Sequence, residues 1–492
     1  MTSREAIAVA VPLLPLLAGL AVAALPSPRA GQRVALLSAP PTALGALITS
    51  AWALIDSDRP VLGHWLCVDA AGGVLVGVIG LVGAASLAVS PTYLATAQTS
   101  LFGTRRPRSH YYTALLVFWA ALLAIPLAAN LGAAWLLVEA STAASALLVA
   151  FSGKPRALEA AWKYLVLTSL GLGVALLGVL VLQLAQHRAG GPIGLSYTSI
   201  HAAAPILDHQ LALLAYLLLL AGLAAKIGWA PVHNWLPDAH SEAPAPVSAL
   251  LSAALLPAVL LVAWRVEQAL AAGVGAGTAH HVFIFFGLAS LAVAVPFLWR
   301  PLAWKRLLAY SSLEHMGVIA LAIGFGSRLA LAGAIVHVVG HALAKSLGFY
   351  AAMPLFGVQP STASHAARGV GRADAGMGAI VGICLAALAG LPPSPLFVSE
   401  LLVALGGIEA GYTTAVIVAL MLLALGFLGL CHALIEAVAG RRRATRPGVP
   451  PPGRRLVMGL AAGCLMLLPA LAGAALALPG STIADALVRG LS

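Results

Sequence analysis

The sequence predicts an all-α membrane protein that crosses the bilayer about fourteen times. Of its 492 residues, 61% are hydrophobic and only 9% are charged, whereas a soluble chain carries about 25% charged residues. The apolar residues form long continuous runs, without the alternation that marks barrel strands. Because backbone groups inside a bilayer must bond to one another, only helices or closed barrels cross it, and continuous runs favour helices.

Each expected span is an apolar run long enough for the ~20 residues that a helix needs to cross the hydrocarbon. In chain order the expected spans are roughly 6–25, 34–54, 69–90, 110–128, 130–151, 160–184, 210–230, 246–264, 281–299, 306–325, 329–352, 377–403, 412–438 and 456–478. The first run is too long for a cleaved signal peptide, and its flank, Arg4 beside Glu5, is nearly neutral.

The basic residues predict the orientation, because cytoplasmic loops hold an excess of Lys and Arg. With both termini on the non-cytoplasmic side, eighteen of the 27 Lys and Arg residues fall in cytoplasmic loops, six on the opposite side and three inside spans. The Arg/Pro-rich stretch 441–455 is the clearest hydrophilic linker, and it either anchors the topology or docks a partner protein or anionic lipid. The four cysteines form no C-x-x-C pair, so no metal or other cofactor is expected.

Ionisable residues inside the expected spans are the candidate functional residues. A charge at bilayer depth costs ~2.5–3.5 kcal/mol on insertion scales and normally faces a bundle interior or a water-filled path. The residues of this kind are Glu139, Lys163, Lys226, Glu314, His315, His337, His341, Lys345 and Glu400. Such a row is typical of a path for protons.

Three of these residues, His337, His341 and Lys345, are four positions apart and so stack on one helical face. Two histidines at this spacing can bind zinc, but no carboxylate or thiol accompanies them in this segment, and the lysine would repel a metal. A proton relay fits better, because histidine titrates near neutral pH and burial makes lysine easier to deprotonate. One such histidine alone would favour a structural role, whereas the trio favours the relay.

Two of the expected spans carry proline breaks beside a charged residue. Lys226 is followed by Pro231 and Pro237, and Glu400 is preceded by the proline-rich stretch 391–396. Two interrupted spans at matching positions of an internal repeat indicate a transporter site. The alternative is that these prolines are only those common in membrane helices.

Several segments resemble the antiporter-like subunits of respiratory complex I and of Mrp cation/proton antiporters. They are KIGWAPVHNWLPDAHSEAP at 226–244, KRLLAYSSLEHMG at 305–317, HVVGHALAK at 337–345 and LAGLPPSPLFVSE at 388–400. The Glu314-His315 variant and the run at 138–164 are most similar to component F of hydrogenase 4, which belongs to membrane-bound, formate-hydrogenlyase-type complexes.

The resemblance implies a fourteen-helix fold with two inverted five-helix repeats and with helices 7 and 12 broken. The repeats would occupy 110–264 and 281–438, after three N-terminal helices in 1–109 and before a basic linker and last helix in 439–492.

The resemblance also implies roles for residues at matching positions. Glu139 and Lys226 would form a charge pair, and Glu400 would be the terminal carboxylate. The connecting relay would be His337, His341 and Lys345, and the supporting residues would be Lys163, His233, Asp238, His240, Glu314 and His315. No catalytic, cofactor-binding or metal-binding residue is implied.

Two positions depart from the family pattern. Pro257 stands where a Lys, His or Asn is common, eight residues before Arg265, so the link from Lys226 to the relay is expected to use water or another residue. An acidic residue common before the KRLLAYSS motif is replaced by the stretch 302–304.

The expected function is proton translocation as a non-catalytic subunit of a redox-driven complex in a prokaryotic inner membrane. Its partners would be other membrane subunits and a soluble hydrogenase-like iron–sulfur module, and not nucleic acid. A cation/proton antiporter or a subunit of an inorganic-carbon-uptake complex is the second interpretation. A membrane scaffold that has lost pumping is the third.

Overall fold

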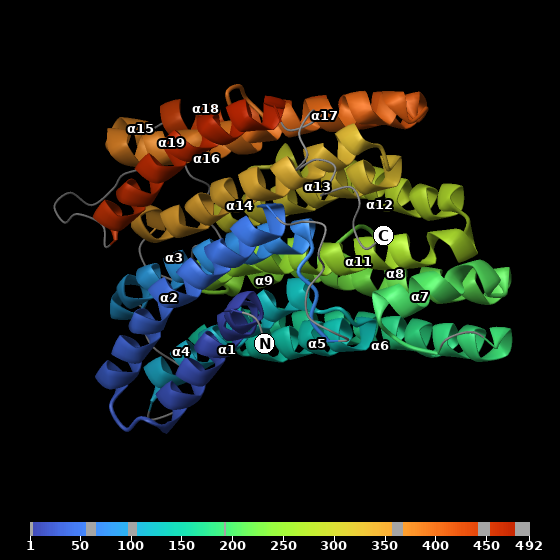
Figure 1. Cartoon of the computed structure of the whole chain (residues 1–492). Coiled ribbons are helices and arrows are strands. Elements are labelled where there is room, and N and C mark those ends of the chain that lie inside the picture. Colours follow the sequence, from blue (N-terminus) through green and yellow to red (C-terminus); the bar gives the residue numbers. More distant parts are fainter. Residues whose placement is uncertain are drawn as a thin grey trace.

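The computed structural model describes residues 3–55, 65–96, 106–190, 193–356, 368–440 and 453–477 (Figure 1). In these residues the chain is helical, and its extended pairings are the isolated bridges Leu66–Ala128 and Asn130–Ser196. The predicted all-α class is therefore confirmed.

The first part of the chain builds the lower half of Figure 1. Its helices are α1 (Ser3–Ala24), α2 (Pro28–Ile55), α3 (Ala70–Thr96), α4 (Pro107–Ala124), α5 (Leu131–Val149), α6 (Pro155–Ala189), α7 (Tyr197–Ala203), α8 (His209–Ile227), α9 (Trp235–Glu242), α10 (Ala245–Leu250) and α11 (Leu256–Val274). A π-helical segment, Leu251–Leu255, joins α10 to α11.

The second part builds the upper half, where α12, α13 and α14 lie beneath α16, α17 and α18 (Figure 1). Its helices are α12 (Ala276–Leu298), α13 (Trp304–Phe325), α14 (Arg328–Phe356), α15 (Val370–Ala373), α16 (Ala375–Leu388), α17 (Pro395–Glu409), α18 (Thr413–Ala439) and α19 (Arg454–Ala477).

Thirteen helical stretches of the described chain are long and apolar enough to cross a membrane. The remaining expected span, 377–403, is divided into α16 and α17, which have 14 and 15 residues. The chain is thus a multi-pass membrane protein, as predicted.

Both predicted helix breaks are present. After α8 the chain leaves the helix at Gly228, whose φ of 78° ends the helix in the left-handed conformation that glycine adopts at no steric cost. The second break separates α16 from α17 and contains Gly390 at a φ of 68°. Prolines at both breaks remove the backbone donors that a continuous helix would need.

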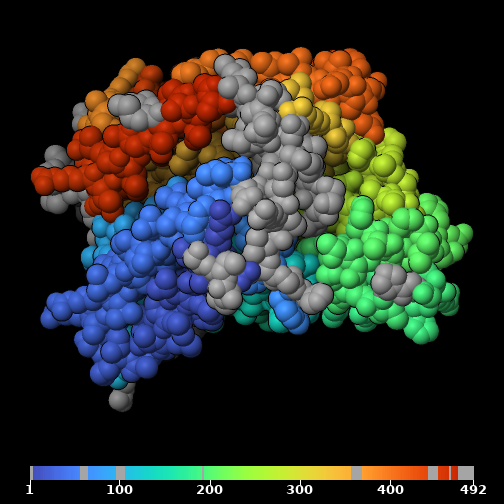
Figure 2. Space-filling model, viewed as in Figure 1, coloured from blue at the N-terminus to red at the C-terminus, as the bar shows by residue number. Residues whose placement is uncertain are grey.

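The central helices are shielded from lipid by the outer ones. In α13 and in the stretch from α10 through α11, every residue of the most apolar 18-residue window is buried inside the protein. Figure 2 shows the blue N-terminal helices, the green α6–α7 region and the red α19 on the outer surface. The buried ionisable residues of α13 and α14 therefore face other helices and not hydrocarbon; they are Lys305, Glu314, His315, His337, His341 and Lys345.

The structure corrects one assignment made from the basic residues. Arg265, expected in a loop on the non-cytoplasmic side, lies inside α11 with 1% of its surface exposed. The expected span 246–264 stops too early, because an arginine after an apolar run usually marks the start of a loop. Most of the basic linker, 441–452, lies outside the described residues, and the division into repeats stays a prediction.

Candidate functional site

The predicted relay face of α14 is buried and turned toward α13. His337, His341 and Lys345 are all inaccessible to solvent. The Lys345 ammonium donates to the Leu308 carbonyl oxygen at 2.6 Å and to Ser311 Oγ at 2.7 Å, both on α13. The four-residue spacing therefore does bring the trio to one face, where neutral oxygens accept the hydrogen bonds of Lys345.

His315 of α13 joins this face. Its Nδ1 lies 3.0 Å from His337 Nε2, and its ring centroid lies 5.1 Å from that of His341. On the far side of His337, Nδ1 is 2.8 Å from Ser399 Oγ on α17. His315 Nε2 and His341 Nδ1 are buried without a hydrogen-bond partner in the structure, so the cluster has free proton-accepting or proton-donating positions.

Serine hydroxyls connect the imidazoles to the lysine. His341 Nε2 lies 3.4 Å from Ser252 Oγ, which lies 2.8 Å from Ser312 Oγ. Ser312 in turn donates to the Leu308 carbonyl that also accepts from Lys345. The two serines were missed at the sequence level, because serine is common in helices and only the fold places these hydroxyls together.

Pro257, one of the departures from the family pattern, lies just after this connection. It has no N–H to bond to the preceding turn, and the widened π-helical segment that contains Ser252 ends two residues before it. Ser252, five residues before Pro257, is the residue of this helix whose hydroxyl contacts His341 and Ser312.

Lys226 lies at the end of α8, directly before the first break, and is fully buried. Its ammonium donates to Thr142 Oγ1 at 2.7 Å and to the Tyr164 hydroxyl. Tyr164 continues the chain to Ser145 Oγ at 2.7 Å. A buried ammonium is here satisfied by neutral oxygens.

Glu139 and Lys226 are not in direct contact in this conformation. Glu139 Oε1 accepts from Ser169 Oγ at 2.7 Å, and Oε2 is buried without a partner in the structure. Thr142, one helical turn after Glu139 on α5, bonds to Lys226 instead. The charge pair stays a prediction, and its closure would require a side-chain movement.

The supporting residues divide into two groups. Lys163, expected inside a span, is 45% exposed and pairs with Glu159 and Asp238, and Asp238 also pairs with Arg306 at 3.1 Å. These charges form a surface network around α9. His240 is fully buried with both ring nitrogens unpartnered in the structure, and its ring stacks on Phe349 at 5.1 Å.

His233, the remaining supporting residue, lies in the first helix break, between α8 and α9. Its Nδ1 is buried without a hydrogen-bond partner in the structure. His233 is therefore close to Lys226 in sequence. Among the described residues, no hydrogen bond connects it to the relay.

Glu314 and Glu400 border one cavity of about 400 Å³ between α13, the second helix break and α18. Its remaining lining is mostly apolar and includes Leu391, Phe397, Leu423 and Phe427. Glu314 Oε2 is buried without a partner in the structure. A Cβ at Gly390 would lie 2.9 Å from Glu400 Oε2, so glycine is needed there for the carboxylate to lie against the break.

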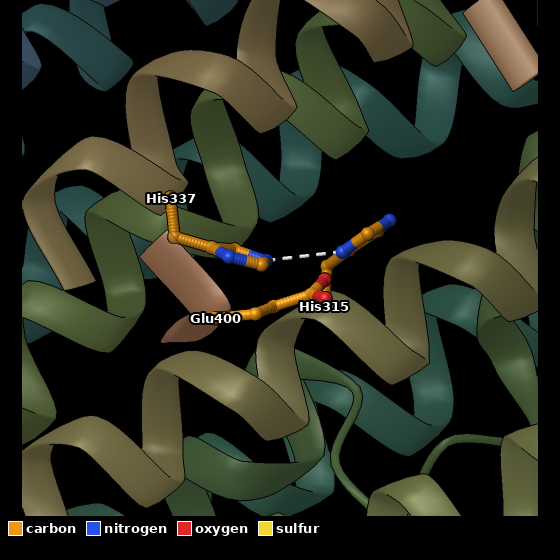
Figure 3. Close-up of side chains that lie close together, drawn as sticks. All are labelled: His315, His337 and Glu400. Atoms are coloured by element: carbon orange, nitrogen blue, oxygen red, sulfur yellow. Dashed lines mark hydrogen bonds between the residues drawn. The ribbon is translucent and has the colours of Figure 1, made fainter. Parts of the chain in front are cut away.

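The fold also brings three metal-ligating side chains together. One ligand atom from each of His315, His337 and Glu400 lies within 4.8 Å of the others (Figure 3). Among the described residues this is the one group of three or more His, Cys, Asp or Glu side chains with such spacing. It joins α13, α14 and α17.

A buried ion pair lies apart from the row and was missed at the sequence level. Arg265 of α11 bonds to Asp69 Oδ2 at 2.7 Å and to the carbonyls of Pro126 and Ala128. Asp69 directly precedes α3, where it resembles an ordinary helix cap, and it does accept from Gly72 N–H. Nothing local in the sequence links two residues so far apart.

Comparisons with known proteins show what the chain is similar to. Residues 128–426 match the model of the family described as NADH:quinone oxidoreductase/Mrp antiporter, transmembrane. The chain is 31% identical over 372 residues to a hydrogenase-4 component F homolog of Methylacidiphilum infernorum, covering 73% of this chain and 75% of that one. It is 31% identical over 424 residues to NADH-quinone oxidoreductase subunit N of Desulforudis audaxviator, covering 83% and 80%.

The fold has a counterpart among solved structures. The chain superposes on a chain of the Mrp complex from Dietzia with a TM-score of 0.82 and 19% identity, covering 100% of this chain and 98% of the other.

Proposed function

Because this chain belongs to the NADH:quinone oxidoreductase/Mrp antiporter transmembrane family, we propose that it conducts protons as a membrane subunit of a redox-driven complex. The observation that carries the proposal is the chain of buried groups from His337 through His315, His341, Ser252 and Ser312 to Lys345. Hydrogen-bonded imidazoles and hydroxyls in a bilayer interior are costly to maintain and mark proton relays.

The two broken helices support the ends of this path. Lys226 lies just before one break, and Glu400 lies within two turns after the other. Discontinuous helices place charged groups at membrane depth while their freed backbone groups line a cavity. Lys226, Lys345 and Glu400 are the positions where a proton rests, and the hydroxyls and imidazoles are the steps between them.

Glu139 controls how readily Lys226 releases its proton. Closing the Glu139–Lys226 pair stabilises the protonated lysine, and opening it leaves a desolvated ammonium that releases its proton more readily. The hydroxyls of Thr142 and Tyr164 hold the lysine in the open arrangement. No direct hydrogen bond connects Lys226 to the relay on α14 among the described residues. Water or His240 bridges this gap, and His240 is buried and unpartnered in the structure.

The proposal includes the partners and the orientation. The relatives named as a hydrogenase-4 component and a quinone oxidoreductase subunit support a complex with other membrane subunits and a soluble iron–sulfur module. We place both termini on the non-cytoplasmic side, and the burial of Arg265 removes one basic residue that spoke against this orientation. The repeats 110–264 and 281–438 would be the two half-channels.

The experiment compares proton uptake and partner turnover in vesicles that contain the whole complex. Replacing Lys226 by Ala is expected to lower proton uptake at least about tenfold, because the first resting site is lost. Lys154, which precedes α6, is the matched control, and Lys154→Ala should keep uptake near the wild-type rate. Unchanged uptake in Lys226→Ala would reject the path.

Purification of the tagged chain in mild detergent tests the partners. Recovery of a hydrogenase-like large subunit with iron–sulfur subunits supports the redox-driven complex. Recovery of small antiporter subunits, or of a zinc-containing carbon-uptake partner, would replace it with the second interpretation, in which the same path works without redox chemistry.

A further inference from the structure

We propose that His315, His337 and Glu400 form a binding site for a divalent transition-metal cation of the zinc type, and that metal bound there interrupts the proton path. The three side chains come from α13, α14 and α17 and converge on a common space (Figure 3). Metal binding is independent of the proposed function; only its effect on protons rests on that function.

The chemistry of the set suits such a cation. Two neutral imidazoles and one carboxylate are the protein ligands of many zinc sites that keep one open position. Imidazole nitrogen selects zinc, copper or nickel over magnesium and calcium, which prefer an all-oxygen shell. The site is therefore expected to discriminate against the hard divalent cations of the cell.

The distances require only a small adjustment. Ligand atoms around a tetrahedral zinc ion with bonds of about 2.0–2.1 Å lie roughly 3.3 Å apart. His315 Nδ1 and His337 Nε2 are already 3.0 Å apart, and the three ligand atoms lie within 4.8 Å of one another. A rotation of the Glu400 side chain, which borders the cavity, supplies the remaining approach.

The surroundings orient the ligands and balance the charge. His337 Nδ1 is held by Ser399 Oγ at 2.8 Å, which leaves Nε2 for the metal, and a fixed ring of this kind strengthens metal binding. Glu314, whose buried Oε2 has no partner in the structure, borders the same cavity as Glu400. Two carboxylates next to one divalent ion compensate its charge.

Of the three side chains, Glu400 is the one that lines this cavity. The cavity volume of about 400 Å³ is far larger than one water molecule needs, so a water molecule beside Glu400 can serve as the fourth ligand.

Lys345 does not prevent binding. It lies eight residues after His337, about 12 Å along a helix, and its ammonium is turned toward Leu308 and Ser311. On α14 alone, His337 has only His341 and Lys345 beside it, which is a poor metal site. The fold instead pairs His337 with His315 and adds a carboxylate from α17.

A bound metal would disconnect the path at one place. The two nitrogens that it needs, His315 Nδ1 and His337 Nε2, are the ones that now face each other at 3.0 Å. Once both coordinate the ion, neither passes a proton to the other.

Cobalt titration of the purified full-length chain in detergent tests the binding. We expect one equivalent of Co²⁺ with the intense visible absorption of a tetrahedral ion, displaced by Zn²⁺. His337→Gln, His315→Gln and Glu400→Gln should each weaken binding at least about tenfold. His341→Gln, on the same face of α14 but outside the triad, is the matched control and should keep the affinity.

The outcomes separate binding from folding and from proton transport. Thermal melting of each variant shows whether a loss of cobalt binding reflects unfolding, and the proposal requires loss in at least one variant that melts like the wild type. No stoichiometric binding, or equal binding in His337→Gln and wild type, overturns the site. Wild-type vesicles that conduct protons equally with and without saturating Zn²⁺ overturn only the blocking effect.

Discussion

At the scale of single residues, buried ammonium groups in this chain are satisfied by neutral oxygens. Lys345 bonds to a carbonyl and a hydroxyl, and Lys226 bonds to two hydroxyls. A carboxylate in contact would fix the charge, whereas hydroxyls and carbonyls allow the group to lose and regain a proton. Lys226 and Lys345 have no carboxylate in direct contact among the described residues, and this suits them to a relay.

Ser252 is one of two serines whose place in the proposed path was found only in the structure. Ser252→Ala removes the hydroxyl between His341 and Ser312, so we expect several-fold slower proton uptake and a stability loss of about 1 kcal/mol. Ser290→Ala on α12 removes a buried hydroxyl that accepts from Ala230 N–H, outside the path. It should lose similar stability but conduct normally, and equal conduction by both variants would remove Ser252 from the relay.

The ion pair of Arg265 and Asp69 is expected to be structural. Arg265→Ala would leave Asp69 as a buried, uncompensated charge, which costs about 3–5 kcal/mol, so the melting temperature in detergent should fall sharply. Arg306→Ala breaks an exposed pair with Asp238 and should cost at most about 1 kcal/mol. Similar melting temperatures for the two variants would contradict this distinction.

At the scale of elements, the positions of the breaks follow from local chemistry. Prolines and glycines beside Lys226 and Glu400 predict interrupted helices, and the structure has both. Span ends were less predictable. The expected span that ends at residue 264 continues for ten residues as helix, to Val274, because Arg265 is buried against a partner that the local sequence does not reveal.

The ion pair between α16 and α19 predicts a pH dependence. Asp374 precedes α16, and the Arg454 guanidinium at the start of α19 lowers the pKa of Asp374 to about 2 from its ordinary value of 3.8. A lowered pKa means that the carboxylate stabilises the fold above about pH 4 and loses this contribution as the pH falls through 2.

Thermal melting from pH 7 down to pH 2 checks this dependence. The wild type should melt above Asp374→Asn at every pH above about 4, and the difference should shrink as the pH approaches 2. Asp208→Asn, at the cap of α8, is a control outside this ion pair. A difference that does not change with pH would contradict the assignment.

At the scale of the whole molecule, the polar row crosses the bundle from one edge to the other. In Figure 1, α5 and α6 lie at one edge, α13 and α14 in the middle, and α17 and α18 at the opposite edge. The row follows the same order, from Glu139 and Lys226 through Lys345 and the histidines to Glu400. The proposed path therefore runs sideways through the bundle.

Features on a single helix could be predicted from the sequence, whereas contacts between helices could not. The relay on α14 was predicted because its members lie on one helix at a regular spacing. The joining of His315 to His337, and of both to Glu400, depends on three helices meeting, which no local pattern encodes. Lys163 lies inside a span as predicted, on α6, but on a face that is partly exposed, which the apolar run does not reveal.

The most direct test of the central claim measures protons moved per partner turnover in vesicles that contain the complex with Lys345→Met. Methionine is unbranched like lysine and only one atom shorter, and it removes the titratable group from the middle of the row. The account predicts that partner turnover continues while proton uptake falls at least about tenfold. Proton uptake at the wild-type ratio would contradict it, because the row could then not be the route that protons take.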